Sequence, residues 1–247
     1  MREESELIKA IDYFVRGEFY CSRQAASQVY DYDSIKHLAF GANVDGRTDE
    51  FIVYNSNPAH VFDTINKLDI RKDYWITVFS DEELDEYETK GYTIKSKEFL
   101  MILNLESGSF ETDTKIIKRV KTEEEAQSIN HFFNKTVIEP EKLNDPNLHF
   151  YIAEENGYPV SHGSYARVDQ TVFLNNVFTS KVHRGKGMAK TLCQKMLIDA
   201  KQEGAVQSVL ISSQMGHPLY LKMGYRDVSK MWVFMSRDKN LSRLPIR

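Results

Sequence analysis

The chain has 247 residues, of which 41% are hydrophobic and 28% charged, and its formal net charge is −4. This composition indicates a globular protein with one large domain or two of ordinary size, and the absence of a basic balance argues against a nucleic-acid-binding protein. No window of 18 apolar residues is present and the charged N-terminus lacks the apolar run of a signal peptide, so we expect a cytoplasmic protein that does not act on membranes.

In the first half, apolar residues recur at helical spacing near the N-terminus, where Leu7, Ile11 and Phe14 share one face. Further on, β-branched and aromatic residues gather in short runs that are typical of strands. The predicted elements, in chain order, are helices over 3–19 and 21–38, a strand over 50–55, a helix over 58–68, a strand over 74–80, a short helix over 81–91 and extended chain over 92–105.

The polar, turn-rich segment 106–114 is the predicted linker. Beyond it, Thr122 and Glu125 have the spacing of a capping box, and Asn156-Gly157 is typical of a tight hairpin turn. The predicted elements, in chain order, are a strand over 115–120, a helix from 122, a loop over 139–147, an antiparallel meander over 149–180, a helix over 187–202, a strand over 208–214, a short helix over 217–224 and extended chain over 225–237.

The sequence contains one internal repeat. Residues 87–102 align without gaps on residues 220–235, at an offset of 133. Identical residues include the tyrosines Tyr87 and Tyr220, and in both copies a strand precedes the short helix. We infer that both halves of the chain end in the same strand–helix–strand unit.

The stretch "VHRGKGMAK", residues 182–190, follows a predicted strand and opens a predicted helix. Unpaired amides at a helix start, glycines that let a ligand approach the backbone, and basic side chains together favour phosphate binding. A nucleotide P-loop is excluded because Ala189 precedes Lys190 and Arg184 holds the place of the first glycine. A dinucleotide loop is excluded because Lys190 holds the place of its third glycine and the preceding strands form a meander.

The stretch does fit the pattern R-x-x-G-x-[GA], as "RGKGMA". Together with "PLYLKMGY" at residues 218–225, it resembles the GNAT N-acetyltransferase superfamily over about residues 115–237. The resemblance implies an α/β fold of mixed α+β type, with a mostly antiparallel mixed sheet, splayed central strands over 171–179 and 208–214, and flanking helices. We therefore expect a GNAT domain over 115–240, preceded over 1–105 by a smaller, degenerate GNAT-like half that lacks the phosphate loop.

The resemblance also implies acetyl-CoA as cosubstrate and a CoA site made by three parts of the chain. A strand end pairs with the pantetheine, the glycine loop holds the pyrophosphate, and Ser213 stands where the family often carries an asparagine. The implied CoA-binding residues are Val177, Phe178, Thr179, Arg184, Gly185, Lys186, Gly187, Met188, Ala189 and Ser213.

For the chemistry, the resemblance implies Tyr220 as general acid. The general base is less defined. His162 has an imidazole whose ordinary pKa suits a base, and Asn176 or its neighbour is placed to hold a water or the acceptor amine. In other members of the family, a water chain acts as the base. Seven histidines without a zinc-type spacing and two isolated cysteines predict no catalytic metal.

The predicted function is acetyl transfer to a primary amine by direct attack on the thioester. Two other functional hypotheses stay open. One is a catalytically idle CoA-binding or regulatory module, and the other is an interaction protein whose glycines only make a turn. The acceptor is a small-molecule or peptide amine of unspecified kind, and a homodimer is possible.

Overall fold

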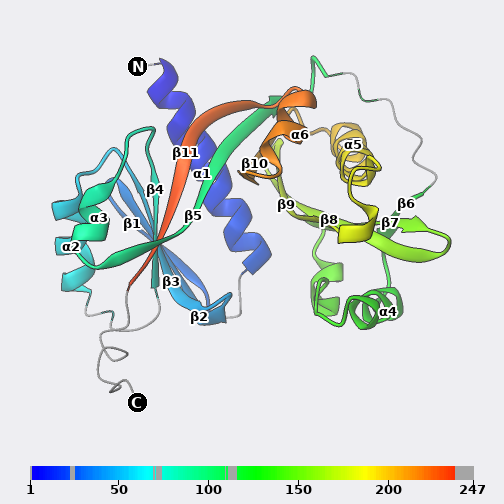
Figure 1. Ribbon diagram of the computed structural model, residues 1–247, viewed down its shortest axis with the longest axis horizontal. Helices are drawn as coiled ribbons and strands as arrows, with labels where there is room; N and C mark the ends of the chain where they lie inside the picture. The colour runs from blue at the N-terminus through cyan, green and yellow to red at the C-terminus, as the bar shows by residue number, and fades with distance from the viewer. Residues whose placement is uncertain are drawn as a thin grey trace. The chain divides into compact units, whose positions relative to one another are not determined.

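The computed structural model describes residues 2–22, 26–68, 70, 74–108, 110 and 116–236 (Figure 1). By contact, the chain divides into two compact units. The first unit consists of Met1–Cys21 and Leu100–Val228, and the second of Ser22–Phe99 and Ser229–Arg247. This division differs from the linear one predicted from sequence, because the N-terminal helix groups with the later residues. The assignment of domains to 1–105 and 115–240 stays a prediction.

The first unit holds a sheet with the strand order β5-β10-β9-β8-β7-β6. Strands β6 to β9 pair antiparallel in sequence, whereas β9 and β10 are parallel. Its elements are α1 (Arg2–Ser22), the end of β5 (Tyr92–Asn104), β6 (Ile117–Val120), α4 (Glu123–Phe133), the 3-10 helix η1 (Pro140–Asn144), β7 (Leu148–Glu155), β8 (Tyr158–Val168), β9 (Thr171–Thr179), the 3-10 helix η2 (Lys181–His183), α5 (Met188–Gln202), β10 (Gln207–Ser213), α6 (His217–Lys222) and the start of β11 (Arg226–Ser236).

Helices cover both faces of this sheet. Figure 1 shows α5 (yellow) and α4 (green) on opposite sides of β7, β8 and β9. Helix α1 packs on the same face as α4, since the ring of Phe14 meets Phe173 of β9 edge to face at 5.8 Å. The two faces therefore have different neighbours, and the side on which a site residue points can be read from its contacts.

Strands β9 and β10 separate part of the way along. Their parallel pairing covers four residue pairs and ends at Leu174 and Leu210, although β9 runs on to Thr179 and β10 to Ser213. At the same level, the pairing of β9 with β8 shifts register and Asn176 has a left-handed φ of 54°. This bulge and the end of pairing open the predicted gap between the central strands.

The second unit has the strand order β1-β2-β3-β4-β11. A core cluster includes Phe51, Ile76, Val61 of α2, Tyr87 of α3 and Phe234 of β11, and all five are buried. Its elements are β1 (Gln28–Tyr32), β2 (Ile35–Val44), β3 (Arg47–Tyr54), α2 (Pro58–Lys67), β4 (Tyr74–Phe79) and α3 (Asp85–Thr89), with the end of β11.

The internal repeat corresponds to a repeated structure. Tyr87 and Tyr220 lie on the short helices α3 and α6, each of which follows one strand and precedes another. From Ser229 on, β11 belongs to the second unit, where it pairs with β4, and from Leu100 on, β5 belongs to the first unit. The repeated last strand thus ends in the unit opposite to its own helix in both copies.

The prediction of a helix over 21–38 is wrong. Helix α1 ends at Ser22, and β1 and β2 then form an antiparallel hairpin with Asp33 at its turn in a left-handed conformation. Val29, Tyr30, Tyr32 and Ile35 are residues that favour strands, so β-propensity decides this segment. The capping box of Thr122 and Glu125 is confirmed, and much of the predicted linker lies outside the described residues.

Candidate active site

The glycine loop lies between the end of β9 and the start of α5. Gly185 and Gly187 have left-handed φ values of 77° and 82°, which glycine adopts without strain. A Cβ built on either residue meets no atom within 4 Å. The space beside the loop backbone is therefore open, because the two glycines have no side chains that could fill it.

Helix α5 begins directly after this loop. Gly187 is its N-cap, and its carbonyl accepts the first helical hydrogen bond from the amide of Thr191 at 3.0 Å. Across the described part of the chain, no side chain caps this end of α5. The first-turn amides, including those of Met188 and Ala189, thus point their positive ends into open space and fit an anionic group such as a pyrophosphate.

The basic side chains of the loop are held in place by neighbours. Arg184 turns back to β9, where its Nε donates to the carbonyl of Thr179 at 3.0 Å. The Nζ of Lys186 lies 3.3 Å from Glu155 Oε2, and His183 Nε2 lies 3.1 Å from the same oxygen. Glu155, at the end of β7, therefore anchors the loop.

The strand end predicted to face pantetheine lies beside the gap in the sheet. Val177 points to the α5 face, where it lies near Gly163, and Phe178 points to the other face. The Thr179 hydroxyl contacts that of Ser161 at 2.9 Å. Across the gap, the Ser213 hydroxyl accepts the amide of Gly216 at 3.2 Å and so shapes the turn into α6.

Tyr220 is 7% exposed and packs against α5. Its hydroxyl lies beside the thiol of Cys193 on α5, and its ring meets Tyr225 at 5.6 Å. Burial, and after it the Cys193 thiol, raises the pKa of Tyr220 well above its ordinary value. The hydroxyl is therefore protonated at neutral pH. The contact with Cys193 is a feature that the sequence pattern does not reveal.

His162 lies on the opposite face of the sheet from Tyr220. Its ring stacks on Phe178 at 5.2 Å and meets Phe133 of α4 edge to face at 5.2 Å. Burial, followed by the charge of Lys135, lowers the pKa of His162 to about 4, and a hydrogen bond to the backbone of Asn176 opposes this shift. His162 is thus neutral at pH 7 and braces the bulge of β9.

The two asparagines of β9 have different environments. Asn176 is exposed at the bulge, whereas Asn175 is half-buried and its Oδ1 accepts the amide of Asn176 at 2.8 Å. The side chain of Asn175 also lies beside the thiol of Cys21, so the end of α1 reaches the point where the strands separate. The Nζ of Lys142 fixes this end by donating to the Cys21 carbonyl at 2.6 Å.

The predicted CoA-binding residues lie at the ends of β9 and β10 and in the loop that leads into α5, but the predicted catalytic residues do not form one cluster. Tyr220 contacts α5, His162 contacts α4, and Asn176 lies at the strand bulge. Within the described ranges, no set of three or more His, Cys, Asp and Glu side chains is arranged to hold a metal ion. No helix in the same ranges is both long and apolar enough to span a membrane.

Comparison with known proteins agrees with this geometry. Residues 117–234 match a family model described as an acetyltransferase (GNAT) domain. No curated protein matches the sequence. The fold is similar to a GCN5-related N-acetyltransferase from Kribbella flavida, with a TM-score of 0.69 and 17% identity over 96% of this chain and 97% of that one.

Two further solved structures have the same fold. A functionally unknown conserved protein from Staphylococcus epidermidis has a TM-score of 0.62 and 12% identity over 87% of this chain and 96% of that one. A GCN5-related N-acetyltransferase from Sphaerobacter thermophilus has a TM-score of 0.56 and 12% identity over 82% of this chain and 76% of that one. The predicted fold class is confirmed, and the chain carries a GNAT acetyltransferase domain over residues 117–234.

Proposed function

We propose that the protein is an acetyl-CoA-dependent N-acetyltransferase that moves an acetyl group to a primary amine. The observation that supports this most is the uncapped start of α5 behind Gly185 and Gly187, at the end of two strands that separate. An open anion site next to a gap in a sheet suits a ligand with a phosphate group at one end and a reactive group at the other.

Bound acetyl-CoA supplies an activated acetyl group as a thioester. In our proposal, the amides of residues 184–189 hold its pyrophosphate, Lys186 adds positive charge, and the backbone of 177–179 orients the pantetheine arm. The amine nitrogen forms a bond to the carbonyl carbon as the carbon–sulfur bond breaks.

Tyr220 is the proposed general acid. Its raised pKa keeps the hydroxyl protonated at neutral pH, so a proton is available where negative charge develops on the leaving sulfur. As the carbon–sulfur bond breaks, the Tyr220 Oη gives its proton to the sulfur, and the surplus proton of the amine, carried by water, restores the Tyr220 hydroxyl. The lowered pKa of His162 makes that imidazole a weak proton acceptor, so we propose that it positions Asn176 and the bulge.

One observation favours the alternative of a CoA-binding module without catalysis. The Tyr220 side chain is nearly buried and its hydroxyl lies beside the Cys193 thiol, so it must turn away from the thiol before it protonates a ligand. An idle module keeps this contact and releases no CoA.

The test is a CoA-release assay across amine classes, comprising aminoglycosides, polyamines, amino acids and peptides, followed by Tyr220→Phe with the best acceptor. We expect this variant to keep its affinity for acetyl-CoA and to lose roughly 10²–10⁴ in kcat. Tyr225→Phe is the matched control, because that buried hydroxyl bonds Ser208 at 2.6 Å. Full activity of Tyr220→Phe contradicts the role of Tyr220 as general acid. If no amine causes CoA release, the proposal that the protein is an acetyltransferase is contradicted.

For the N-terminal half, we propose a GNAT-like origin without a second CoA site. The fold match to the Kribbella flavida protein covers nearly the whole chain, and the strand–helix–strand repeat is present in both halves. The acceptor amine, the cytoplasmic location and a homodimer remain predictions.

A further inference from the structure

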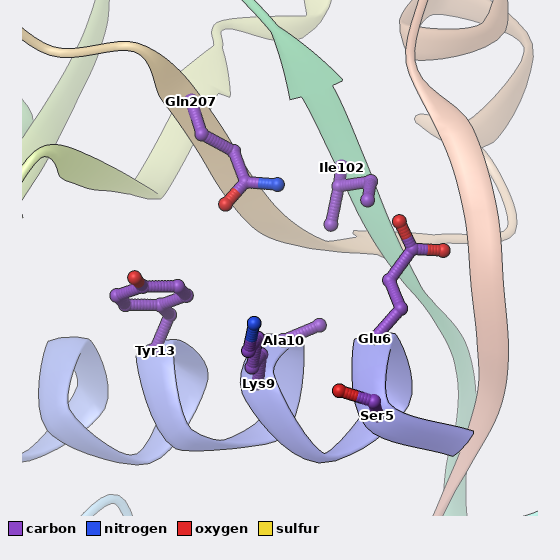
Figure 2. A pocket seen from close by; sticks show the side chains of 7 residues that line it. All are labelled: Ser5, Glu6, Lys9, Ala10, Tyr13, Ile102 and Gln207. Carbon is purple, nitrogen blue, oxygen red and sulfur yellow. The ribbon is translucent and has the colours of Figure 1, made fainter. Parts of the chain in front are cut away.

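A cavity lies in the first unit, away from the glycine loop. It has a volume of about 500 Å³, which suits a small organic molecule. Helix α1 forms one wall, and the start of β10 and the end of β5 form the other (Figure 2). The lining residues are Ser5, Glu6, Lys9, Ala10, Tyr13, Ile102 and Gln207.

The polar side chains of this cavity converge on its interior. Figure 2 shows Lys9, Tyr13 and Glu6 rising from α1 and the Gln207 amide reaching toward them from β10. Neither Lys9 nor Tyr13 forms a hydrogen bond or ion pair with any residue that the structure describes. Two donors that face a cavity without partners are available to a ligand.

The charges of the cavity favour an anionic ligand. Glu6, its one acidic lining residue, is paired with Arg226, so its negative charge is already balanced. The ammonium of Lys9 has no such partner and leaves the cavity with a surplus positive charge. Ala10 and Ile102 give it an apolar floor for a short carbon chain.

The cavity is separate from the proposed acetyl-transfer site. Lys9 and Cys21 are twelve residues apart on α1, which corresponds to about 18 Å along a helix, and it is Cys21 that reaches Asn175 beside the strand bulge. Gln207 stands at the first residue of β10, whereas the gap opens beyond Leu210.

We propose that this cavity binds a small organic carboxylate. Lys9 pairs with the carboxylate, Tyr13 and Gln207 hydrogen-bond to hydroxyl or carbonyl groups of the ligand, and Ala10 and Ile102 contact its carbon chain. The site is distinct from the CoA site and needs no catalytic activity of the protein.

The test uses the full chain with ¹³C-labelled isoleucine methyl groups and two probes of equal shape, 3-hydroxybutyrate and its uncharged amide. Ile102 reports on the cavity, and Ile129, in the core cluster around α4, is the internal control. We expect 3-hydroxybutyrate to shift the Ile102 methyl signal saturably while Ile129 stays unchanged, and the amide to bind at least tenfold more weakly.

Variants complete the test. Lys9→Met should weaken binding of 3-hydroxybutyrate about tenfold or more, Lys9→Arg should largely restore it, and Lys222→Met, on the exposed side of α6, should bind like the unaltered chain. The proposal is overturned if Ile102 shows no saturable shift, if the amide binds as well as the carboxylate, or if Lys9→Met binds with unchanged affinity.

Discussion

His162 couples the stability of the first unit to pH. Its folded-state pKa of about 4 lies below the ordinary value of 6.5, so in this interval the unfolded chain binds more protons than the folded one. The free energy of unfolding therefore falls as the pH drops from about 6.5 to about 4, by an amount on the order of 3 kcal/mol from this residue.

We predict that His162→Phe has a flatter pH dependence, because phenylalanine takes up no proton and keeps the ring stack with Phe178. Urea unfolding at pH 7 and pH 4.5 measures this, and the variant should lose less stability between the two. His131→Phe, at an exposed position of α4, is the control and should follow the unaltered chain. Equal pH slopes for His162→Phe and the unaltered chain rule out the lowered pKa.

Single residues also show what the sequence predicts and what it cannot. The two glycines of the loop and Tyr220 follow from local patterns, because a left-handed turn and a helix start leave a signature within a few residues. The Cys193 contact of Tyr220 and the anchoring of Lys186 by Glu155 join distant segments. Such contacts depend on the register of the sheet, which no local pattern fixes.

At the scale of elements, α1 and β9 approach each other closely at Gly17. A Cβ on this glycine would lie 2.4 Å from the Cβ of Phe173, and that atom moves only if the strand moves. Alanine in a helix is favoured over glycine by about 1 kcal/mol, so propensity alone predicts that Gly17→Ala is stabilising.

We predict the opposite, a loss of about 1–3 kcal/mol from overpacking. Chemical denaturation measures it, and Ile8→Ala, at a partly exposed position of the same helix, serves as the comparison for a small change in α1. A Gly17→Ala variant that is as stable as the unaltered chain, or more so, contradicts the close packing of α1 on β9.

The elements of the second half are predicted more closely than those of the first. The capping box, the Asn156-Gly157 turn and the helix over 187–202 each have a strong local signal. The wrong helix prediction over 21–38 has a local cause. Ala25, Ala26 and Ser27 are weakly compatible with a helix, but the residues that follow them alternate as in a strand. Pairing in the β1–β2 hairpin decides in favour of the strand.

At the scale of the whole molecule, the two units do not follow the order of the chain. The first unit takes its first helix from the N-terminus and the end of β5 from the first half, while β11 passes into the second unit. A repeat in the sequence reveals that two similar pieces exist, but it does not reveal which unit each last strand joins.

This arrangement predicts that the GNAT domain does not fold alone. A fragment of residues 106–236 lacks α1, with its buried Ile11 and Phe14, and the β5 residues Leu100 and Ile102. We expect it to show no cooperative thermal transition, and we expect co-expression with residues 1–105 to restore one. Calorimetry checks this. A fragment that unfolds cooperatively at the temperature of the full chain contradicts the division into units.

The central claim is that the loop at the start of α5 binds acetyl-CoA, and isothermal titration tests it most directly. Gly187→Trp fills the open space beside the glycine loop. Gly91→Trp puts the same residue at a glycine with a similar positive φ and open surroundings in the other unit. We predict saturable binding by the unaltered chain and by Gly91→Trp, with at least tenfold weaker binding by Gly187→Trp. The absence of binding to the unaltered chain at millimolar acetyl-CoA, or equal affinity in Gly187→Trp, would contradict the claim.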